Sequence, residues 1–281
     1  MSQPWDAAHH MTLVSPRRLN RLAMPVFAAI LLGSCAPLPG DRLAITEAGT
    51  YEISEIGHGS PPIVFEAGLG AYKESWNKIV PTVAENCAVF AYDRPGVGHS
   101  EPTARPRHGT IIVEDLRRLL RERGVARPYV LVGHSAGGLY MQLFARLHPD
   151  EVAGLVLVDP THPTQFEGDG ALEHRGLLAV GLASLVMTGA MKEEFDGLEE
   201  TGREVLAAPS LSADIPIIIL IAPDKSGTPI ADFDNAKRAD FARLYPSAIV
   251  REVDGGHDVP QTNPQVVIDA IADVVRKAQR H

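Results

Sequence analysis

Cysteine is scarce in this chain, which has only Cys35 and Cys87 among its 281 residues. A scaffold held together by several disulfides is therefore excluded, and Cys87 is expected to pack as a small apolar side chain. Basic residues are also outnumbered, because 26 Lys and Arg stand against 35 Asp and Glu, for a formal net charge of -9. Since the body of the chain has no basic stripe, nucleic acid is not an expected partner.

Long apolar runs and internal repeats are missing as well. The apolar stretch near the start, residues 22–32, is too short to span a bilayer comfortably. No repeat or low-complexity tract interrupts the chain, so a repeat architecture is not expected. The sequence does have length and apolar content: 45% of its residues are hydrophobic, which suits one larger α/β domain with a sizeable core.

The first 35 residues differ in kind from the rest. Three arginines between positions 17 and 21 precede the apolar residues 22–32, which is the pattern of a secretory signal peptide. The next residues, Gly33-Ser34-Cys35, complete a stretch that resembles the lipobox of bacterial lipoproteins. This resemblance implies a signal peptide over residues 1–34, a lipidated Cys35 and a place in the bacterial cell envelope. A cleaved signal without lipid, an uncleaved anchor and a start at Met11 are the alternatives.

A lipidated Cys35 has two consequences for the mature chain. Cys87 would have no partner, so no internal disulfide could form. Residues 35–48 would serve as a tether between the lipid anchor and the folded domain, which is predicted to occupy residues 49–281. Contact with a membrane is expected only through this anchor.

Strand-like and helix-like segments alternate after the tether, which predicts a mostly parallel sheet with helices on both faces. Six apolar runs are too continuously hydrophobic for a sheet that is wetted on one side. These predicted strands cover residues 62–66, 88–92, 129–132, 154–158, 217–221 and 248–253. The predicted helices cover residues 75–86, 111–123, 136–148, 232–245 and 264–279.

One long segment breaks this alternation. Residues 160–214 contain helix-like runs, such as residues 177–187, but no strand-like run. Since this length exceeds a plain crossover, the segment is predicted to be a small helical cap over the site. A longer crossover that packs on the side of the sheet is the alternative.

The sequence Gly133-His134-Ser135-Ala136-Gly137 lies between a predicted strand and a predicted helix. Glycines two positions before and after a serine let the chain turn sharply from strand to helix, and the serine hydroxyl is then exposed at the corner. A side chain at either glycine would clash. The pattern predicts that Ser135 is a nucleophile.

Four motifs together resemble the α/β-hydrolase superfamily, and within it the group of serine esterases, lipases and peptidases. The resemblance covers about residues 50–279, and the motifs are Glu66-Ala67-Gly68-Leu69-Gly70, the segment 93–100 with sequence DRPGVGHS, the elbow around Ser135, and Gly255-Gly256-His257. It implies the α/β-hydrolase fold and an order of nucleophile, acid and histidine along the chain. Asp93 and Arg94 are expected to make structural hydrogen bonds in a turn, and a part in lining the pocket is the alternative.

Serine is a poor nucleophile until a base takes its proton, so an imidazole must reach Ser135. His257 follows the last predicted strand on a glycine loop and is the predicted base, whereas His134 is predicted to pack inside the elbow. The acid has two candidates, because Asp159 and Asp224 each follow a predicted strand. Asp159 is preferred by a narrow margin over Asp224.

The resemblance also implies an oxyanion hole formed by the backbone N–H groups of Leu69 and Ala136. The chain departs here from the family, which usually has a His-Gly turn where this sequence has Ala67-Gly68 preceded by Glu66. Because the donor is a backbone group, this change does not remove the hole. Glu66 is predicted to be a structural carboxylate, and an acid that tunes the pocket is the alternative.

These residues predict a serine hydrolase without cofactor or metal that acts on a small acyl substrate, most simply a carboxylic ester, through an acyl-enzyme. No histidine pair has helical ligand spacing with a carboxylate between them. The serine excludes the relatives that displace halide from their substrate, because those relatives require a carboxylate nucleophile. A peptidase or thioesterase of the same fold, and a receptor-like protein that binds a ligand with slow turnover, are the alternatives.

Overall fold

The computed structural model describes residues 37–47, 49–171, 187 and 189–280. The predicted signal peptide, the predicted lipidation site Cys35 and most of the helix-like run at 177–187 lie outside these described residues. Within the described ranges, no helix combines the length and the apolar character that crossing a membrane requires.

An eight-stranded sheet in the order β1-β2-β4-β3-β5-β6-β7-β8 forms the centre of the described fold. The pairs β1/β2 and β2/β4 are antiparallel, and all other neighbouring pairs are parallel. This confirms the mostly parallel sheet. The strands are β1 Asp41–Thr46, β2 Gly49–Ile56, β3 Ile63–Glu66, β4 Val89–Tyr92, β5 Tyr129–His134, β6 Val152–Val158, β7 Ile217–Ile221 and β8 Ile249–Glu252.

The predicted start of the domain at residue 49 is wrong, because β1 lies within the segment predicted to be a tether. It pairs with β2 along its whole length, and Leu38, which precedes it, is buried in the core. Sequence periodicity could not reveal β1 because its position at the sheet edge leaves Leu43 and Ile45 exposed. The folded body therefore includes residues from at least Leu38 onward.

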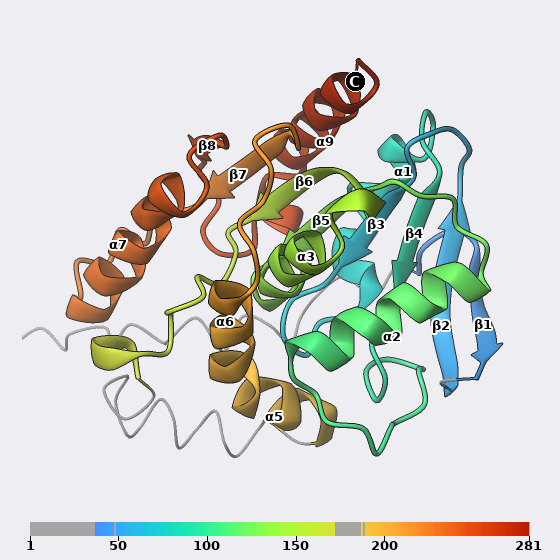
Figure 1. Ribbon diagram of the computed structural model, residues 1–281, viewed down its shortest axis with the longest axis horizontal. Helices are drawn as coiled ribbons and strands as arrows, with labels where there is room; N and C mark the ends of the chain where they lie inside the picture. Colours follow the sequence, from blue (N-terminus) through green and yellow to red (C-terminus); the bar gives the residue numbers. More distant parts are fainter. Residues whose placement is uncertain (1–36, 48, 172–186, 188, 281) are drawn as a thin grey trace, which may run out of the picture.

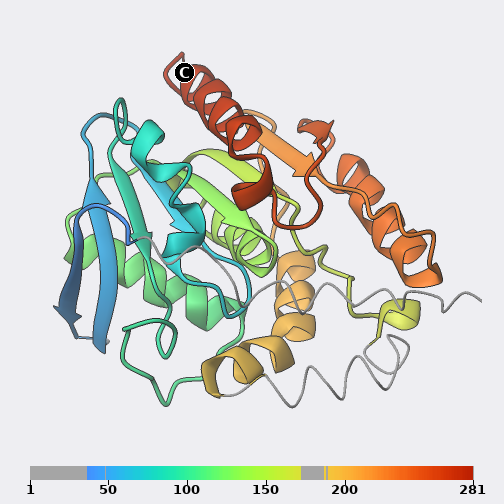
Figure 2. The same ribbon diagram turned by 180° about the vertical axis from the view of Figure 1, so that it is seen from behind.

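Helices cover both faces of the sheet (Figures 1 and 2). One apolar cluster joins the sheet to α2, α3 and α7, and a second joins it to α1 and α9. The described helices are α1 Val80–Val83, α2 Gly109–Glu122, α3 Ala136–Leu147, α5 Gly189–Asp196, α6 Leu198–Ala207, α7 Pro229–Leu244, α8 Val259–Thr262 and α9 Pro264–Ala278, with short 3-10 helices at Lys73–Trp76, Pro149–Glu151 and Gly168–Gly170.

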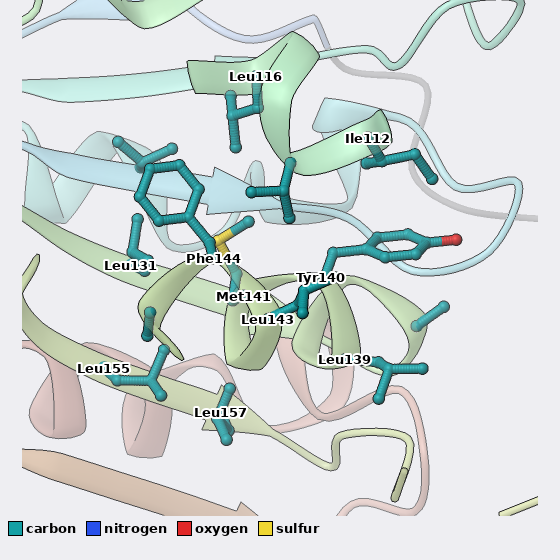
Figure 3. Close-up of a cluster of buried hydrophobic side chains, with 14 of the residues drawn as sticks. Ile112, Leu116, Leu131, Leu139, Tyr140, Met141, Leu143, Phe144, Leu155 and Leu157 are labelled. Carbon is teal, nitrogen blue, oxygen red and sulfur yellow. The ribbon is translucent and has the colours of Figure 1, made fainter. Parts of the chain in front are cut away.

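The helix α3 is buried along nearly its whole length and lies at the centre of the first cluster. Figure 3 shows its apolar side chains, including Met141 and Phe144, between those of α2 and those of the strands β5 and β6. Such burial fixes the axis of the helix, and thereby the position of its first turn. Since Ser135 directly precedes α3, the core also fixes the place of the predicted nucleophile.

The described part of the segment between β6 and β7 contains α5 and α6 and no strand. Helix α6 packs against α3 and α2. Two hydrogen bonds tie it to the first turn of α2: Gly109 N–H donates to Thr201 at 2.8 Å, and Thr110 N–H donates to Glu204 at 2.9 Å. Helix α6 is therefore anchored to the body of the domain.

Candidate active site

Ser135 occupies a strained turn between β5 and α3, with φ of 53° and ψ of -121°. Few residues other than glycine adopt such angles, because the Cβ atom crowds the neighbouring backbone. The glycines on either side allow close approach. A Cβ atom at Gly133 would lie 2.6 Å from the Gly137 carbonyl oxygen, and one at Gly137 would lie 2.4 Å from the Ala67 carbonyl oxygen. The sequence therefore needs glycine at both positions.

His257 lies in the loop after β8, and its Nε2 is 2.9 Å from the Ser135 Oγ. The preceding Gly255 and Gly256 have φ of 132° and 68°, in the region that favours glycine. The backbone of His257 is also held in place, because its carbonyl oxygen is 2.8 Å from the His134 Nε2. The glycine loop thus brings the imidazole within hydrogen-bond distance of the serine hydroxyl.

Asp159 directly follows β6, and its Oδ2 is 2.6 Å from the Nδ1 of His257. The Ala222 N–H donates to the Asp159 Oδ1 at 3.0 Å, and the carboxylate is almost fully buried. Burial alone would raise the pKa of Asp159, but hydrogen bonds from Arg238 and His257 outweigh it and hold the pKa below its ordinary value. The carboxylate is therefore ionised at neutral pH.

Arg238, on α7, is a site residue that sequence analysis missed. Its Nε and Nη2 donate to the two oxygens of Asp159 at 2.8 and 2.9 Å, which makes a paired contact between guanidinium and carboxylate. Burial lowers the pKa of Arg238, but the contact with Asp159 more than compensates and raises it. No pattern in the sequence could have indicated this pair, since arginines on a polar helix are typical of a solvated surface.

Asp224, the alternative acid, has different partners. Its Oδ1 accepts the N–H of Ser226 at 2.8 Å, and its own N–H donates to the side chain of Asn235 at 2.9 Å. The Asn235 side chain also donates to the Asp224 carbonyl oxygen at 2.8 Å. These bonds shape the loop between β7 and α7. Of the two candidates, Asp159 is the one in hydrogen-bond contact with His257.

Leu69 and Ala136, the predicted oxyanion donors, come from two segments that are both close to Ser135. Ala136 is the first residue of α3, and first-turn N–H groups of a helix have no partner within that helix. The helix dipole also favours negative charge at this end. The loop that holds Leu69 is close to the nucleophile, since a Cβ atom on Gly68 would lie 3.4 Å from the Cβ of Ser135.

His134 is buried in the elbow, and burial lowers its pKa to about 3, with a smaller effect from the nearby His257. The ring is therefore neutral in the native state, whereas an unfolded histidine binds a proton below about pH 6.5. The unfolded state then holds more protons, so this group makes the free energy of unfolding decrease as the pH falls from about 6.5 towards 3.

We expect His134→Gln to reduce this pH dependence by up to about 1.4 kcal/mol per pH unit, the effect of one proton. The measurement is urea unfolding of the wild type and the variant between about pH 7 and about pH 4. The exposed His58 offers a control, His58→Gln. Other buried groups titrate in the same pH range. The readout is therefore the difference between His134→Gln and the wild type in the slope of the free energy of unfolding against pH. Equal slopes would show that His134 does not contribute.

Two groups of side chains among the described residues have donor atoms close enough for a metal ion: His108, Glu200 and Glu204, and a second group of Asp41, Glu52 and Glu74. In the first group, Glu204 already bonds His108 at 2.8 Å and the N–H of Thr110 at 2.9 Å. In the second group, the ammonium of the buried Lys73 bridges all three carboxylates. Neither group includes Ser135, His257 or Asp159.

Comparison with known proteins agrees with this fold. The profile of a family described as alpha/beta hydrolase fold matches residues 61–181. A solved structure of a thermophilic esterase from Thermogutta terrifontis superposes with a TM-score of 0.61 at 20% identity, and the match covers 85% of this chain and 98% of that one. The protein belongs to the α/β-hydrolase superfamily, which confirms the predicted fold.

Two curated relatives are similar over longer stretches of sequence. The magnesium-chelatase 30 kDa subunit of Rhodobacter capsulatus is 30% identical over 234 residues, which cover 70% of this chain and 80% of the relative. Esterase Rv0045c of Mycobacterium tuberculosis is 31% identical over 165 residues, which cover 58% of this chain and 53% of the esterase. The first three curated relatives are matched over only 15% to 39% of their own length.

Proposed function

We propose that this protein is a serine hydrolase that cleaves carboxylic esters of small substrates through an acyl-enzyme. The observation that carries the proposal is one chain of contacts: the Ser135 Oγ lies 2.9 Å from His257 Nε2, and His257 Nδ1 lies 2.6 Å from the Asp159 carboxylate. An ionised carboxylate on Nδ1 leaves Nε2 free to accept the serine proton. Such an arrangement turns a weakly nucleophilic hydroxyl into a reactive one.

In the first half of the reaction, the Ser135 Oγ attacks the carbonyl carbon of the ester while His257 takes its proton. The charge that develops on the carbonyl oxygen is stabilised by the N–H groups of Ala136 and Leu69. His257 then protonates the leaving alcohol, and the acyl group stays on Ser135. In the second half, His257 removes a proton from water as the water oxygen attacks the acyl carbon; the bond from that carbon to the Ser135 Oγ then breaks, His257 returns the proton to Oγ, and the acid is released.

Esters are the preferred substrates for two reasons. First, an alkoxide is a better leaving group than an amide nitrogen, so cleavage of an ester depends less on protonation of the leaving group by His257. Second, an esterase is among the curated relatives. The same residues can also attack amides and thioesters. A substrate panel must therefore compare the three kinds of bond with the acyl group held constant.

The test combines covalent labelling with turnover. We expect a fluorophosphonate to modify Ser135, as located by mass spectrometry of the labelled peptide, and p-nitrophenyl acetate and butyrate to be hydrolysed in parallel. Labelling should block hydrolysis in proportion to the fraction of Ser135 modified. An acyl anilide and an acyl thioester with the same acyl groups complete the panel. Absence of both adduct and turnover would contradict the proposal and favour a protein that only binds its ligand.

A further inference from the structure

Arg94 lies just after β4, and its buried guanidinium uses all five of its N–H bonds. Its Nη1 donates to the Glu66 carboxylate at 2.5 Å and to the Ala67 carbonyl oxygen at 2.8 Å. Its Nη2 donates to the Gly68 carbonyl oxygen at 2.7 Å, and Nη2 and Nε both donate to the Glu194 carboxylate at 2.8 Å. One side chain thus holds two consecutive carbonyl groups of the loop that contains Leu69.

The Gly68 carbonyl oxygen accepts from Arg94 at 2.7 Å and also from the Ala71 N–H at 3.2 Å, and the direction of this carbonyl determines where the next N–H group points. In a trans peptide the C=O and the N–H of the same unit point in opposite directions, so the Gly68 carbonyl and the Leu69 N–H face opposite sides of the loop. Arg94 binds the carbonyl side, which leaves the N–H side turned away from it. Within the described part of the chain, the Leu69 N–H donates to no other group.

The loop also lies directly against the nucleophile elbow. A Cβ atom on Gly68 would be 3.4 Å from the Cβ of Ser135, and one on Gly137 would be 2.4 Å from the carbonyl oxygens of Glu66 and Ala67. At this separation, a rotation of the peptide unit between Gly68 and Leu69 changes whether the Gly68 carbonyl or the Leu69 N–H is directed towards Ser135. The orientation of that peptide is therefore a property on which oxyanion binding depends.

Arg94 is itself held by a carboxylate from the segment between β6 and β7. Glu194, on α5, is fully buried and also contacts Arg107. Burial raises the pKa of Glu194, but Arg94 and then Arg107 outweigh this and lower it, so the carboxylate is charged. Without Glu194, the Arg94 guanidinium would lose two of its five hydrogen bonds. The position of α5 is thus connected, through Glu194 and Arg94, to the loop of Leu69.

We infer that Arg94 is a positioning residue for the oxyanion hole, and that Glu194 keeps it in place from α5. The inference rests on the serine hydrolase function proposed above. It assigns a role to the arginine of the DRPGVGHS motif beyond shaping a turn. The chain has Ala67-Gly68 where the family usually has His-Gly, and here Arg94 bonds the carbonyl oxygens of both residues together with the carboxylate of the preceding Glu66.

The test compares an ester with the corresponding thionoester, in which sulfur replaces the carbonyl oxygen. Sulfur accepts hydrogen bonds poorly, so an intact oxyanion hole prefers the oxygen substrate. The ratio of kcat/KM for the two substrates is independent of the fraction of folded enzyme, because both are measured on the same sample. A defect of folding alone therefore leaves the ratio unchanged, whereas a displaced Leu69 N–H lowers it.

We expect Arg94→Lys to lower kcat for the ester by about 10²-fold with little change in KM, as for loss of one oxyanion donor. The ratio of ester to thionoester should fall at least about tenfold. Glu194→Gln, which keeps the shape of the side chain but removes its charge, should lower the ratio in the same direction and by less. Lysine is a suitable replacement because it keeps the charge but lacks the planar guanidinium with five N–H donors, so it cannot replace all five hydrogen bonds of Arg94.

Arg146→Lys is the matched control. Arg146 is also buried, and it also donates to two carbonyl groups, those of Val205 in α6 and Ala208 at the end of α6, at 3.1 and 3.4 Å. It lies at the far end of α3 from Ser135. Its replacement should leave the ratio at the wild-type value, even if stability falls.

Each outcome separates the inference from the proposed function. If Arg94→Lys loses activity but keeps the wild-type ratio, the role of Arg94 is only structural and the inference is wrong. An unchanged ratio in Glu194→Gln, with a lowered ratio in Arg94→Lys, would show that Glu194 on α5 is not needed to keep Arg94 in place. If the wild type cleaves neither substrate and Ser135 is not labelled, the proposed function itself fails.

Discussion

Alanine in place of Ser135 is expected to lower kcat for p-nitrophenyl butyrate by about 10⁶-fold, because the covalent pathway is lost with the hydroxyl. A residual rate above that in water should remain, since the oxyanion donors and the binding site are untouched. Initial rates of p-nitrophenolate release measure the effect, and circular dichroism checks the fold. The exposed Ser226 offers a control, and Ser226→Ala should keep wild-type kcat.

His257 should act with Ser135 as one unit. We expect His257→Ala to cost nearly as much as Ser135→Ala, and the double variant to cost no more than either single variant. Residues that contribute independently would instead have additive effects on the activation free energy. Near-normal turnover in His257→Ala would refute the role of the imidazole, whatever Ser135→Ala shows.

Much of the fold could be predicted because its strongest signals are local. The runs at 217–221 and 154–158 are rich in Ile, Val and Leu, and both are buried strands in the parallel part of the sheet. Such side chains pack on both faces of a covered sheet, so no alternation interrupts them. The elbow around Ser135 is local too, since glycine spacing and the flanking segments all lie within a few residues.

The edge of the sheet was missed for the opposite reason. β1 has one neighbouring strand, and its exposed Leu43 and Ile45 lie outside the core that makes the central strands recognisable. A short segment after a proposed signal peptide is easily interpreted as a tether. Pairing with β2 over six residues holds it in the sheet, and this pairing is set by tertiary structure rather than by local composition.

The acid could not be fixed from the sequence because both candidates follow neighbouring parallel strands, and strands of that kind end at the same edge of the sheet. β6 and β7 are paired, so Asp159 and Asp224 both begin loops on the side of His257. The two aspartates differ in the conformation of their loops and in their partners, because Arg238 of α7 donates to Asp159. The role of Arg94 could not be predicted from the sequence either, because its partner Glu194 is 100 residues away. Contacts at such separations carry no local signal.

Replacing Asp159 by asparagine is the second large expected effect. We expect kcat to fall about 10⁴-fold, because an amide stabilises the wrong tautomer of His257 and cannot balance the charge of the imidazolium. Asp224→Asn, the matched variant, should stay near the wild-type rate, since Asp224 bonds the loop around Ser226. Equal losses in the two variants, or a larger loss in Asp224→Asn, would overturn the assignment. Rates with p-nitrophenyl butyrate are the measurement.

One further variant separates catalysis from stability. Asp159→Asn also breaks the buried ion pair with Arg238, and loss of one partner from such a pair commonly costs about 3–5 kcal/mol of stability. Arg238→Met breaks the same pair but leaves the carboxylate 2.6 Å from His257. If the activity lost in Asp159→Asn came only from the broken pair, Arg238→Met would lose as much. We expect a far smaller loss, because it is the contact between Asp159 and His257 that holds the imidazole ready to accept the proton of Ser135.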